Sequence, residues 1–205
     1  MATDALAKKD KEETPVVTTS MVKDLRERTG AGIMDCKRAL QEAEGSLEKA
    51  ADLLKQQGLA KAEKKAGRLA SQGLVEVYVH AGGRIAAMVE INCETDFVAR
   101  TPEFRELARN VAMQVAAMSP TYISEDDVPA EAWAALEGEH GDRKKAAEAV
   151  ALLQQPFIKD PKTSIRELIR AGILKLGENV QVSRFSRFEV GANRPAVAES
   201  DAESE

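Results

Sequence analysis

Residues 89–100 read VEINCETDFVAR, a stretch that joins a strand to a helix. Its first half alternates apolar and polar residues, which is the two-residue period of a half-buried strand. Thr101-Pro102 follows, and a threonine N-cap with proline at the first helical position is typical of a helix start. Between them lies a short polar connection that ends in Phe97. We therefore expect a strand and a helix that hold this connection between them.

Two further strands are predicted beside this one. Valines alternate with polar residues over 75–79, and Ala-Gly-Gly at 81–83 supplies a hairpin turn. The return strand is then expected over 84–92, with its apolar residues on one face. Together these segments predict an antiparallel hairpin that leads into the connection at Phe97.

A last strand is expected over 180–190, and its apolar residues fall on both faces. Counting by two places four of them on one face and Phe185 on the other. The four are Val180, Val182, Phe188 and Val190. Such a strand needs cover on both faces, or a β-bulge that shifts its alternation.

Two helices are expected to pack with these strands. The first begins at Thr101, ends at Ser119 and carries one apolar stripe. The stripe comprises Phe104, Leu107, Val111, Val115 and Met118. The second opens at a capping box of Ser164 and Glu167 and closes at Gly177. Residues 121–155 are expected to be mostly helical, although their pattern is weak.

Residues 20–58 are expected to form three short helices. Ser20 is the predicted N-cap of the first helix, and Gly30 ends it. Ser46 is the predicted N-cap of the third, and Gly58 is expected to stop that helix as the glycine of a Schellman motif. A bundle of about 40 residues is marginally stable alone, which suits a recognition module.

The predicted fold class is α+β, with a small antiparallel sheet of about three strands packed with helices. Both ends of the chain are polar and lack an apolar period, so they are expected to be disordered. The predicted segments are a disordered extension over 1–19, a three-helix domain over 20–58, a linking helix over 59–72, a core domain over 73–191 and a disordered acidic tail over 192–205.

Composition narrows the classes of function. The formal net charge of -5 gives no whole-chain attraction to nucleic acid or to anionic membrane. A Lys-rich stretch over 55–68 is interpreted as a solvated helix rather than an RNA site. No apolar run approaches the roughly 20 residues that span a bilayer, and the first residues are polar. We expect a cytoplasmic protein in which Cys36 and Cys93 are reduced thiols.

The sequence lacks the residue sets of common catalytic and nucleotide-binding sites. It has no GxSxG, P-loop or GxGxxG motif. Neither His80 nor His140 has a nucleophile at a recognisable spacing, so both are interpreted as exposed structural side chains. The two cysteines lack metal-ligand spacing. We therefore expect a protein that acts by binding, without enzyme activity, cofactor or metal.

Two segments are candidates for binding a partner. The ring of Phe97 either folds back onto the core or is offered to a partner, and Thr95 and Asp96 beside it have a plain role as caps of the turn. The second segment places Ile33 and Met34 after the glycines of a turn between helices. These glycines need no partner to explain them, while the two apolar side chains form a patch that a small bundle cannot fully bury.

These segments resemble the bacterial elongation factor Ts family. Residues 22–40, VKDLRERTGAGIMDCKRAL, are similar to its amino-terminal signature, and residues 89–100 are similar to its second signature. Residues 177–191, GENVQVSRFSRFEVG, are similar to its carboxy-terminal strand. The likeness covers about residues 20–191. Two long signatures and a matching end, in the same order, are far more specific than one short motif.

The resemblance implies a guanine-nucleotide exchange factor that acts on elongation factor Tu. Residues 20–58 would be a ubiquitin-associated-like domain that docks on the partner's G domain. The residues in that contact would be Arg26, Ile33 and Met34. The segment that displaces the magnesium bound with GDP would be Thr95, Asp96, Phe97 and Val98. Phe97 would be a wedge between two helices of the G domain, and Asp96 would disturb the elements that hold magnesium and phosphates, so that GTP can replace GDP.

The length of the chain resembles the short type of this family, in which two chains pair to complete the partner-binding surface. Some short members have a cysteine between the two carboxy-terminal phenylalanines, where this chain has Ser186. A non-covalent homodimer through 180–190 is therefore expected. The alternative functions are a ubiquitin-associated-like adaptor that uses 20–58 alone and an RNA-binding protein that uses 55–68, while a hydrolase has the least support.

Overall fold

The computed structural model describes residues 17–192, apart from the side chains of Leu59, Lys61 and Glu63. The predicted disorder of 1–19 and 192–205 therefore lies outside the described residues, except at residues 17–19 and 192. The chain divides into two compact units, 1–61 and 62–205. None of the helices within the described range is both long enough and apolar enough to cross a membrane.

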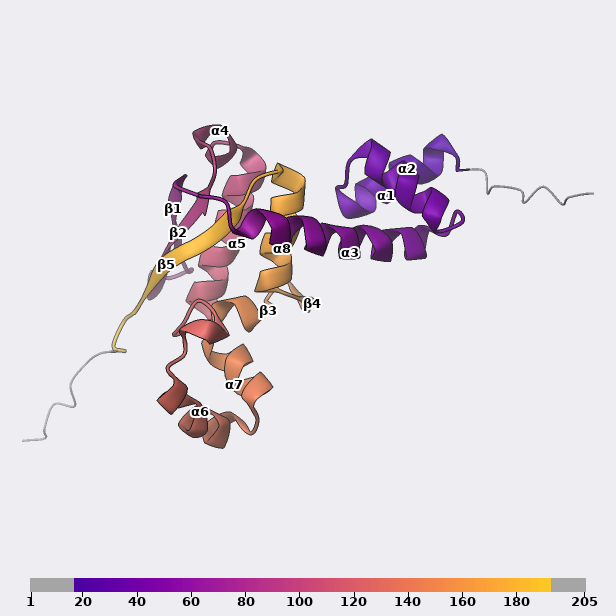
Figure 1. Ribbon diagram of the computed structural model, residues 1–205. Coiled ribbons are helices and arrows are strands. Elements are labelled where there is room, and N and C mark those ends of the chain that lie inside the picture. Colours follow the sequence, from indigo (N-terminus) through magenta and orange to yellow (C-terminus); the bar gives the residue numbers. More distant parts are fainter. Residues whose placement is uncertain (1–16, 193–205) are drawn as a thin grey trace, which may run out of the picture. The chain divides into compact units, whose positions relative to one another are not determined.

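The first unit is a small bundle of three helices (Figure 1). These are α1 (Thr19–Thr29), α2 (Ile33–Glu42) and the first part of α3 (Leu47–Ala66). Its buried core comprises Leu25, Cys36, Ala39, Leu40, Ala43, Ala50 and Leu54. The three-helix arrangement is as predicted, while its likeness to a ubiquitin-associated domain stays a prediction.

Local sequence sets the ends of these helices. Gly30 has a φ of 67° and ends α1, and the hydroxyl of Ser46 accepts a hydrogen bond in the first turn of α3, so both predictions are confirmed. The prediction of Ser20 as the cap of α1 is wrong. The hydroxyl of Thr18 accepts the hydrogen bond from the N–H of Met21 instead, so the helix begins at Thr19, inside the segment expected to be disordered.

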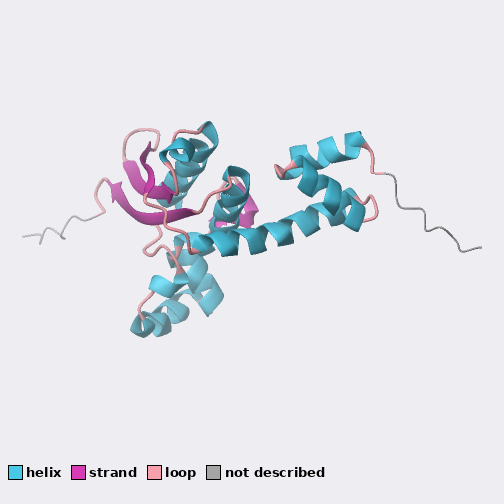
Figure 2. Cartoon of the chain, turned by 45° about the horizontal axis from the view of Figure 1, so that its top comes forward, coloured by secondary structure: helices cyan, strands magenta, loops and turns pink. Residues whose placement is uncertain are grey.

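The predicted helix stop at Gly58 is also wrong. The helix α3 runs unbroken through this residue, so the third helix of the bundle and the expected linking helix are one element (Figure 2). A glycine inside a helix costs about 1 kcal/mol relative to alanine. Its neighbours in the sequence are Lys, Gln, Leu, Ala and Glu, which are strong helix formers and offset that cost. The division into two units falls after Lys61, within this helix.

The second unit is built on an antiparallel sheet of three strands in the order β1-β2-β5. Their bounds are Gln72–Val79 for β1, Ile85–Cys93 for β2 and Val180–Glu189 for β5. The predicted sheet and the hairpin turn at 81–83 are therefore confirmed. Gly73 in β1 has a φ of 147°, and a Cβ atom there would lie 2.2 Å from the carbonyl oxygen of Ile91. No other residue fits that backbone without strain.

Helices α5 (Pro102–Met118) and α8 (Ile165–Leu176) pack with this sheet and complete the main core (Figure 1). The N-cap at Thr101, the capping box of Ser164 and Glu167 and the end at Gly177 are all confirmed. Four members of the predicted stripe on α5 are buried, but Met118 is exposed at the end of the helix. The core therefore forms between the inner face of the sheet and these two helices.

The remaining elements lie between α5 and α8 or just before α5. They are α4 (Asp96–Ala99), η1 (Glu125–Asp127), η2 (Ala130–Ala132), α6 (Trp133–His140), α7 (Arg143–Val150), η3 (Leu152–Gln154), β3 (Pro156–Phe157) and β4 (Asp160–Ser164). The helical expectation for 121–155 is confirmed, and a small core around Trp133 and Ala146 holds α6 and α7 together. The hairpin of β3 and β4 was not predicted.

A bulge decides which face of β5 is buried. Glu90 of β2 lies opposite Arg184, whereas the next residue, Ile91, lies opposite Val182. Ser183 is therefore an extra residue, and the alternation of side chains reverses there.

The predicted grouping of the apolar residues on β5 is consequently wrong, and the bulge is the alternative that holds. Val180, Val182 and Phe185 all face the core, while Phe188 and Val190 lie on the opposite, exposed face. The exposed face of the sheet carries six large apolar side chains, those of Val75, Val77, Val79, Met88, Phe188 and Val190.

Candidate functional site

The connection after β2 holds Phe97 out of the protein. β2 ends at Cys93, and α4 begins at Asp96 after only two residues. Phe97 lies in the first turn of this short helix, and its side chain is 79% exposed. The ring therefore does not fold back onto the core, although Val98, the next residue, packs partly against it. Of the two alternatives left open for Phe97, exposure is the one that holds.

Thr95 is the N-cap of α4. Its backbone is extended, with φ of -127° and ψ of 153°, and its hydroxyl oxygen accepts a hydrogen bond from the N–H of Val98 at 3.4 Å. This bond satisfies one of the free N–H groups at the start of a helix. The predicted capping role of Thr95 is confirmed, and it fixes the direction in which α4 leaves the sheet.

Glu178, which follows α8, holds the same connection from the other side. One carboxylate oxygen, Oε2, accepts the backbone N–H groups of Glu94 at 3.1 Å and Thr95 at 3.0 Å. The other, Oε1, accepts the hydroxyl proton of Thr95 at 2.6 Å. Hydrogen bonds to a carboxylate are about twice as strong as neutral ones. Three donors of the connection thus converge on one side chain.

Asn179 and Glu94 make the exchange of hydrogen bonds reciprocal. The backbone N–H of Asn179 donates to Oε1 of Glu94 at 2.7 Å, and the side-chain amide of Asn179 donates to the carbonyl oxygens of Ala66 and Arg68. The guanidinium of Arg68 lies 3.5 Å from the same carboxylate of Glu94. The segment before α4 and the segment before β5 therefore hold each other in place.

Asp96 and Cys93 flank this arrangement. Asp96, the first residue of α4, pairs with its C-cap residue Arg100 at 2.7 Å, and the carboxylate of Asp96 remains partly exposed. The thiol of Cys93 is buried and donates a hydrogen bond to the carbonyl oxygen of Thr95 at 3.1 Å. Burial raises the pKa of the Cys93 thiol, and the negative charges of Glu178 and Asp96 raise it further.

The other predicted contact surface lies in the first unit. Ile33 and Met34 begin α2 and are 55% and 71% exposed, and Arg26 on α1 is exposed as well. These side chains leave the core to Leu25 and Leu40, which are fully buried. The predicted patch therefore exists beside a helix turn.

Comparison with known proteins places this sequence in a family. The family model described as Elongation factor TS matches residues 58–140. A protein named Elongation factor Ts from Carboxydothermus hydrogenoformans is 51% identical over 195 residues, which is 86% of this chain and 90% of the relative. Proteins of the same name from Syntrophomonas wolfei and Caldanaerobacter subterraneus are 50% and 49% identical, and the matches cover 91% and 98% of those chains.

The chain belongs to the elongation factor Ts family. It is thus a translation elongation factor of the Ts type, as the two signatures over 22–40 and 89–100 predicted. The family match at 58–140 includes all four residues from Thr95 to Val98. The exposed ring of Phe97 is thus a feature of the matched region.

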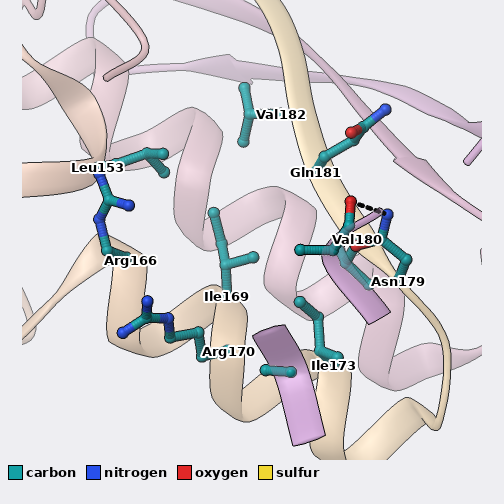
Figure 3. A pocket seen from close by; sticks show the side chains of 11 residues that line it. Leu153, Arg166, Ile169, Arg170, Ile173, Asn179, Val180, Gln181 and Val182 are labelled. Atoms are coloured by element: carbon teal, nitrogen blue, oxygen red, sulfur yellow. Dashed lines mark hydrogen bonds between the residues drawn. The ribbon is translucent and has the colours of Figure 1, made fainter. Parts of the chain in front are cut away.

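A cavity of about 230 Å³ lies elsewhere in the second unit (Figure 3). Apolar side chains of Ile169, Ile173 and Val182 line it together with Arg166 and Arg170. None of the predicted site residues lines it. Among the described residues, no three His, Cys, Asp or Glu side chains gather as a metal site requires. What distinguishes the predicted segment is the exposed ring of Phe97.

Glu94, Glu178 and Asn179 are the residues that the motif analysis missed. Glu178 and Asn179 lie in the signature GENVQVSRFSRFEVG, directly after the glycine that ends α8. The signal was a polar pair immediately before a strand of a core domain. Asn179 is only 2% exposed, and a buried amide needs hydrogen-bond partners from another segment.

Proposed function

We propose that this chain is a cytoplasmic guanine-nucleotide exchange factor that binds elongation factor Tu with GDP and promotes release of the nucleotide. Thr95, Asp96, Phe97 and Val98 form the segment that enters the G domain. Phe97 separates two helices there, and Asp96 disturbs the elements that hold magnesium and phosphates. The chain makes and breaks no covalent bond, so it acts by binding and is not an enzyme.

The single observation that carries this proposal is the exposure of Phe97 on a fixed support. A phenylalanine that is 79% exposed is stabilised little by the core of its own protein. Aromatic side chains that fill a partner's pocket dominate the binding energy of many interfaces. The ring lies on a short helix whose N-cap is held by hydrogen bonds, so little conformational freedom is lost on binding.

The thermodynamics of exchange follow from linkage between two ligands of one protein. GDP is held by contacts to its phosphates and to magnesium. A protein that binds nucleotide-free elongation factor Tu more tightly than the GDP-bound form must weaken the affinity for GDP by the same ratio. Insertion of one aromatic ring contributes roughly 2–4 kcal/mol, which corresponds to about 30- to 1000-fold in affinity at about 1.4 kcal/mol per decade.

Release of a fluorescent GDP analogue from elongation factor Tu tests the proposal. The chain should accelerate release, and Phe97→Ala should reduce that acceleration by about 30-fold or more. Leu174→Ala is the matched control, because Leu174 is another exposed apolar side chain of the same unit. No acceleration by the wild-type chain would rule out the exchange function. Acceleration that Phe97→Ala leaves intact would instead exclude the ring as the wedge.

The first unit supplies a second contact in this proposal. Arg26, Ile33 and Met34 would dock on the G domain. This contact would bring the exchange segment, residues 95–98, to the nucleotide site of elongation factor Tu. An adaptor that uses this unit alone would bind a partner through the same patch but would be indifferent to Phe97. An RNA-binding protein would instead lose affinity for RNA when the lysines of 55–68 are neutralised.

A non-covalent homodimer through 180–190 is the remaining part of the proposal. Phe188 and Val190 are 68% and 58% exposed, and they share the outer sheet face with Val75, Val77, Val79 and Met88. The register places Ala86 opposite both Val79 and Phe188, so the apolar residues are neighbours across the strands. An apolar face of this kind on a soluble chain favours association with a second, identical face.

The oligomeric state tests this part directly. Phe188→Asp should convert the dimer to a monomer, because a charge would then lie in the buried contact. Sedimentation velocity at micromolar concentration measures the change. A wild-type chain that already sediments as a monomer would exclude the dimer without affecting the exchange proposal.

A further inference from the structure

The segments around Glu94 and Glu178 are joined by hydrogen bonds that go beyond the N-cap bond of α4. Thr95 alone caps α4 through its hydroxyl oxygen. The additional contacts come from Glu178, which lies 84 positions after Glu94 and 83 positions after Thr95. They converge on the residue that precedes the helix of Phe97.

We propose that Glu178 is a positioning residue for nucleotide exchange: by accepting the Thr95 hydroxyl proton and two backbone N–H groups, it holds the start of α4 so that Phe97 is presented to the partner. This inference rests on the proposed function. It assigns to Glu178 a role that acts through Thr95 and needs no contact with the partner. The Glu178 clamp denotes Glu178 with its three donors on Glu94 and Thr95.

The orientation of one hydroxyl group is the first step in the argument. The Thr95 hydroxyl donates its proton to Oε1 of Glu178 at 2.6 Å, which leaves the oxygen lone pairs directed away from that carboxylate. The N–H of Val98 lies 3.4 Å from this oxygen and donates to it. The carboxylate therefore sets the hydroxyl as a donor on one side and an acceptor on the other, which is the arrangement that an N-cap requires.

The backbone bonds are the second step. Oε2 of Glu178 accepts the N–H groups of Glu94 and Thr95, the two residues that connect β2 to α4. These two bonds fix the backbone immediately before α4, where a change of one dihedral angle would swing the whole short helix. A helix of four residues has too few hydrogen bonds of its own to resist such a change.

The return contact shows that Glu178 is itself held. The next residue, Asn179, donates its backbone N–H to Glu94 and its side-chain amide to the end of α3 and the loop after it. In Figure 3, Asn179 lies at the start of β5 with its amide group in a hydrogen bond. Gly177 ends α8 with a φ of 79°, so the chain turns into Glu178 at a defined point. The clamp thus has a fixed base on β5 and α8.

Pre-organisation is the consequence for binding. A ring that samples many directions must be ordered when it enters a cleft, and that ordering weakens the complex. With the clamp in place, the direction of α4 is set before the partner arrives. Loss of the clamp should therefore reduce exchange even though Phe97 is unchanged.

Four variants test the inference in the 205-residue chain. Glu178→Ala removes all three acceptor contacts, and Glu178→Gln keeps an oxygen acceptor but loses the charge. Glu167→Ala is the matched control, because Glu167 is a carboxylate of α8 that accepts a backbone N–H and a hydroxyl from Ser164, away from the exchange segment. The double variant Phe97→Ala with Glu178→Ala tests whether Glu178 acts through the ring.

The expected results separate positioning from general stability. Glu178→Ala should lower the accelerated release of fluorescent GDP by about tenfold, which corresponds to about 1.4 kcal/mol, and Glu178→Gln should lower it less. Glu167→Ala should lose comparable thermal stability but keep release within about twofold. The double variant should be no slower than Phe97→Ala alone, because two residues that act through one ring are not additive.

A measurement without the partner distinguishes this inference from the exchange function. Amide hydrogen exchange over 94–99 should be faster in Glu178→Ala and unchanged in Glu167→Ala. If the wild-type chain failed to accelerate GDP release, the proposed function would be wrong, and this measurement would still decide whether the clamp orders α4. Unchanged hydrogen exchange, unchanged GDP release by Glu178→Ala, or additive losses in the double variant would each overturn the positioning role.

Discussion

Two surfaces of this protein present large apolar side chains at the start of a helix, but they are restrained in different ways. Ile33 and Met34 begin α2, where the cap residue Gly32 makes no side-chain hydrogen bond. The bonds around that turn join residues two to five positions apart. Phe97 lies in the first turn of α4, where Glu178 contributes bonds that span 83 and 84 positions.

The difference concerns what each surface needs in order to exist. The patch of Ile33 and Met34 requires only a contiguous stretch of sequence and the small core beneath it. The presentation of Phe97 depends on residues far apart in the second unit, since Glu178, which follows α8, bonds to the connection before α4. A short-range surface is therefore lost with its own unit, whereas a long-range surface is weakened by single changes far away in the sequence.

The largest expected effect comes from removing the core of the short-range surface. Leu25 is fully buried in a core of seven small or medium side chains. Leu25→Ala should lower the free energy of unfolding of the first unit by about 2–5 kcal/mol. A unit this small has little stability to lose. Hydrogen exchange should show loss of protection over 17–61 with protection of 72–189 retained. Leu69→Ala, at an exposed leucine, is the control, and loss of protection in both units would contradict the independence of the two surfaces.

The next largest effect tests the support of the long-range surface. Gly73 has a φ of 147°, and a methyl group there would meet the backbone of β2 just before the connection to α4. Gly73→Ala should therefore destabilise the second unit by about 1–3 kcal/mol or more. Urea unfolding measures the loss. Gly67→Ala should have little effect, because no atom lies within 4 Å of a Cβ at that position, and equal losses in both variants would refute the steric argument.

The same division between short and long range explains how much of the fold the sequence predicts. The end of α1 at Gly30, the N-cap at Thr101 and the capping box of Ser164 and Glu167 all depend on neighbours within four residues, and all were predicted correctly. The predicted helix stop at Gly58 was wrong, because strong helix formers on both sides outweigh the cost of one glycine. Local patterns also gave the three strands.

Features that depend on pairing could not be predicted in this way. The apolar pattern of β5 left a bulge as one of two alternatives, but it could not place that bulge at Ser183, because the position depends on the register with β2. The effect of the bulge is to move Phe188 to the opposite face from Val182. The site divides likewise. Thr95, Asp96, Phe97 and Val98 were identified from a signature, while Glu178 was missed because its partners are distant in sequence.

A smaller effect is expected at the short-range surface itself, if the proposed function holds. Met34 is 71% exposed, and Met34→Ala should raise the concentration needed for half-maximal GDP release by about three- to tenfold. The maximal rate should stay the same, because this contact docks the chain and does not enter the nucleotide site. Lys23→Ala on the exposed side of α1 is the control. A reduced maximal rate in Met34→Ala would place the patch in the exchange step.

The smallest effect compares the two buried thiols, one beneath each surface. Burial first, and then the charges of Glu178 and Asp96, raise the pKa of Cys93, so the thiolate that reacts with iodoacetamide is scarcer than in an ordinary cysteine of pKa about 8.5. Alkylation of Cys93 at pH 8.5 should therefore be slow in the native chain, and its rate should rise as the pH increases.

The variant Glu178→Ala removes one of the charges and loosens the connection before α4. Both changes favour reaction, so the alkylation rate at Cys93 should increase several-fold. Cys36, a buried residue of α2 in the other unit, should react at an unchanged rate, since its restraints are local. Mass spectrometry of the two cysteine peptides gives both rates in one sample. An equal increase at Cys36 would mean that Glu178→Ala loosens the whole chain, in which case the long-range bonds would stabilise the fold in general without holding α4 in particular.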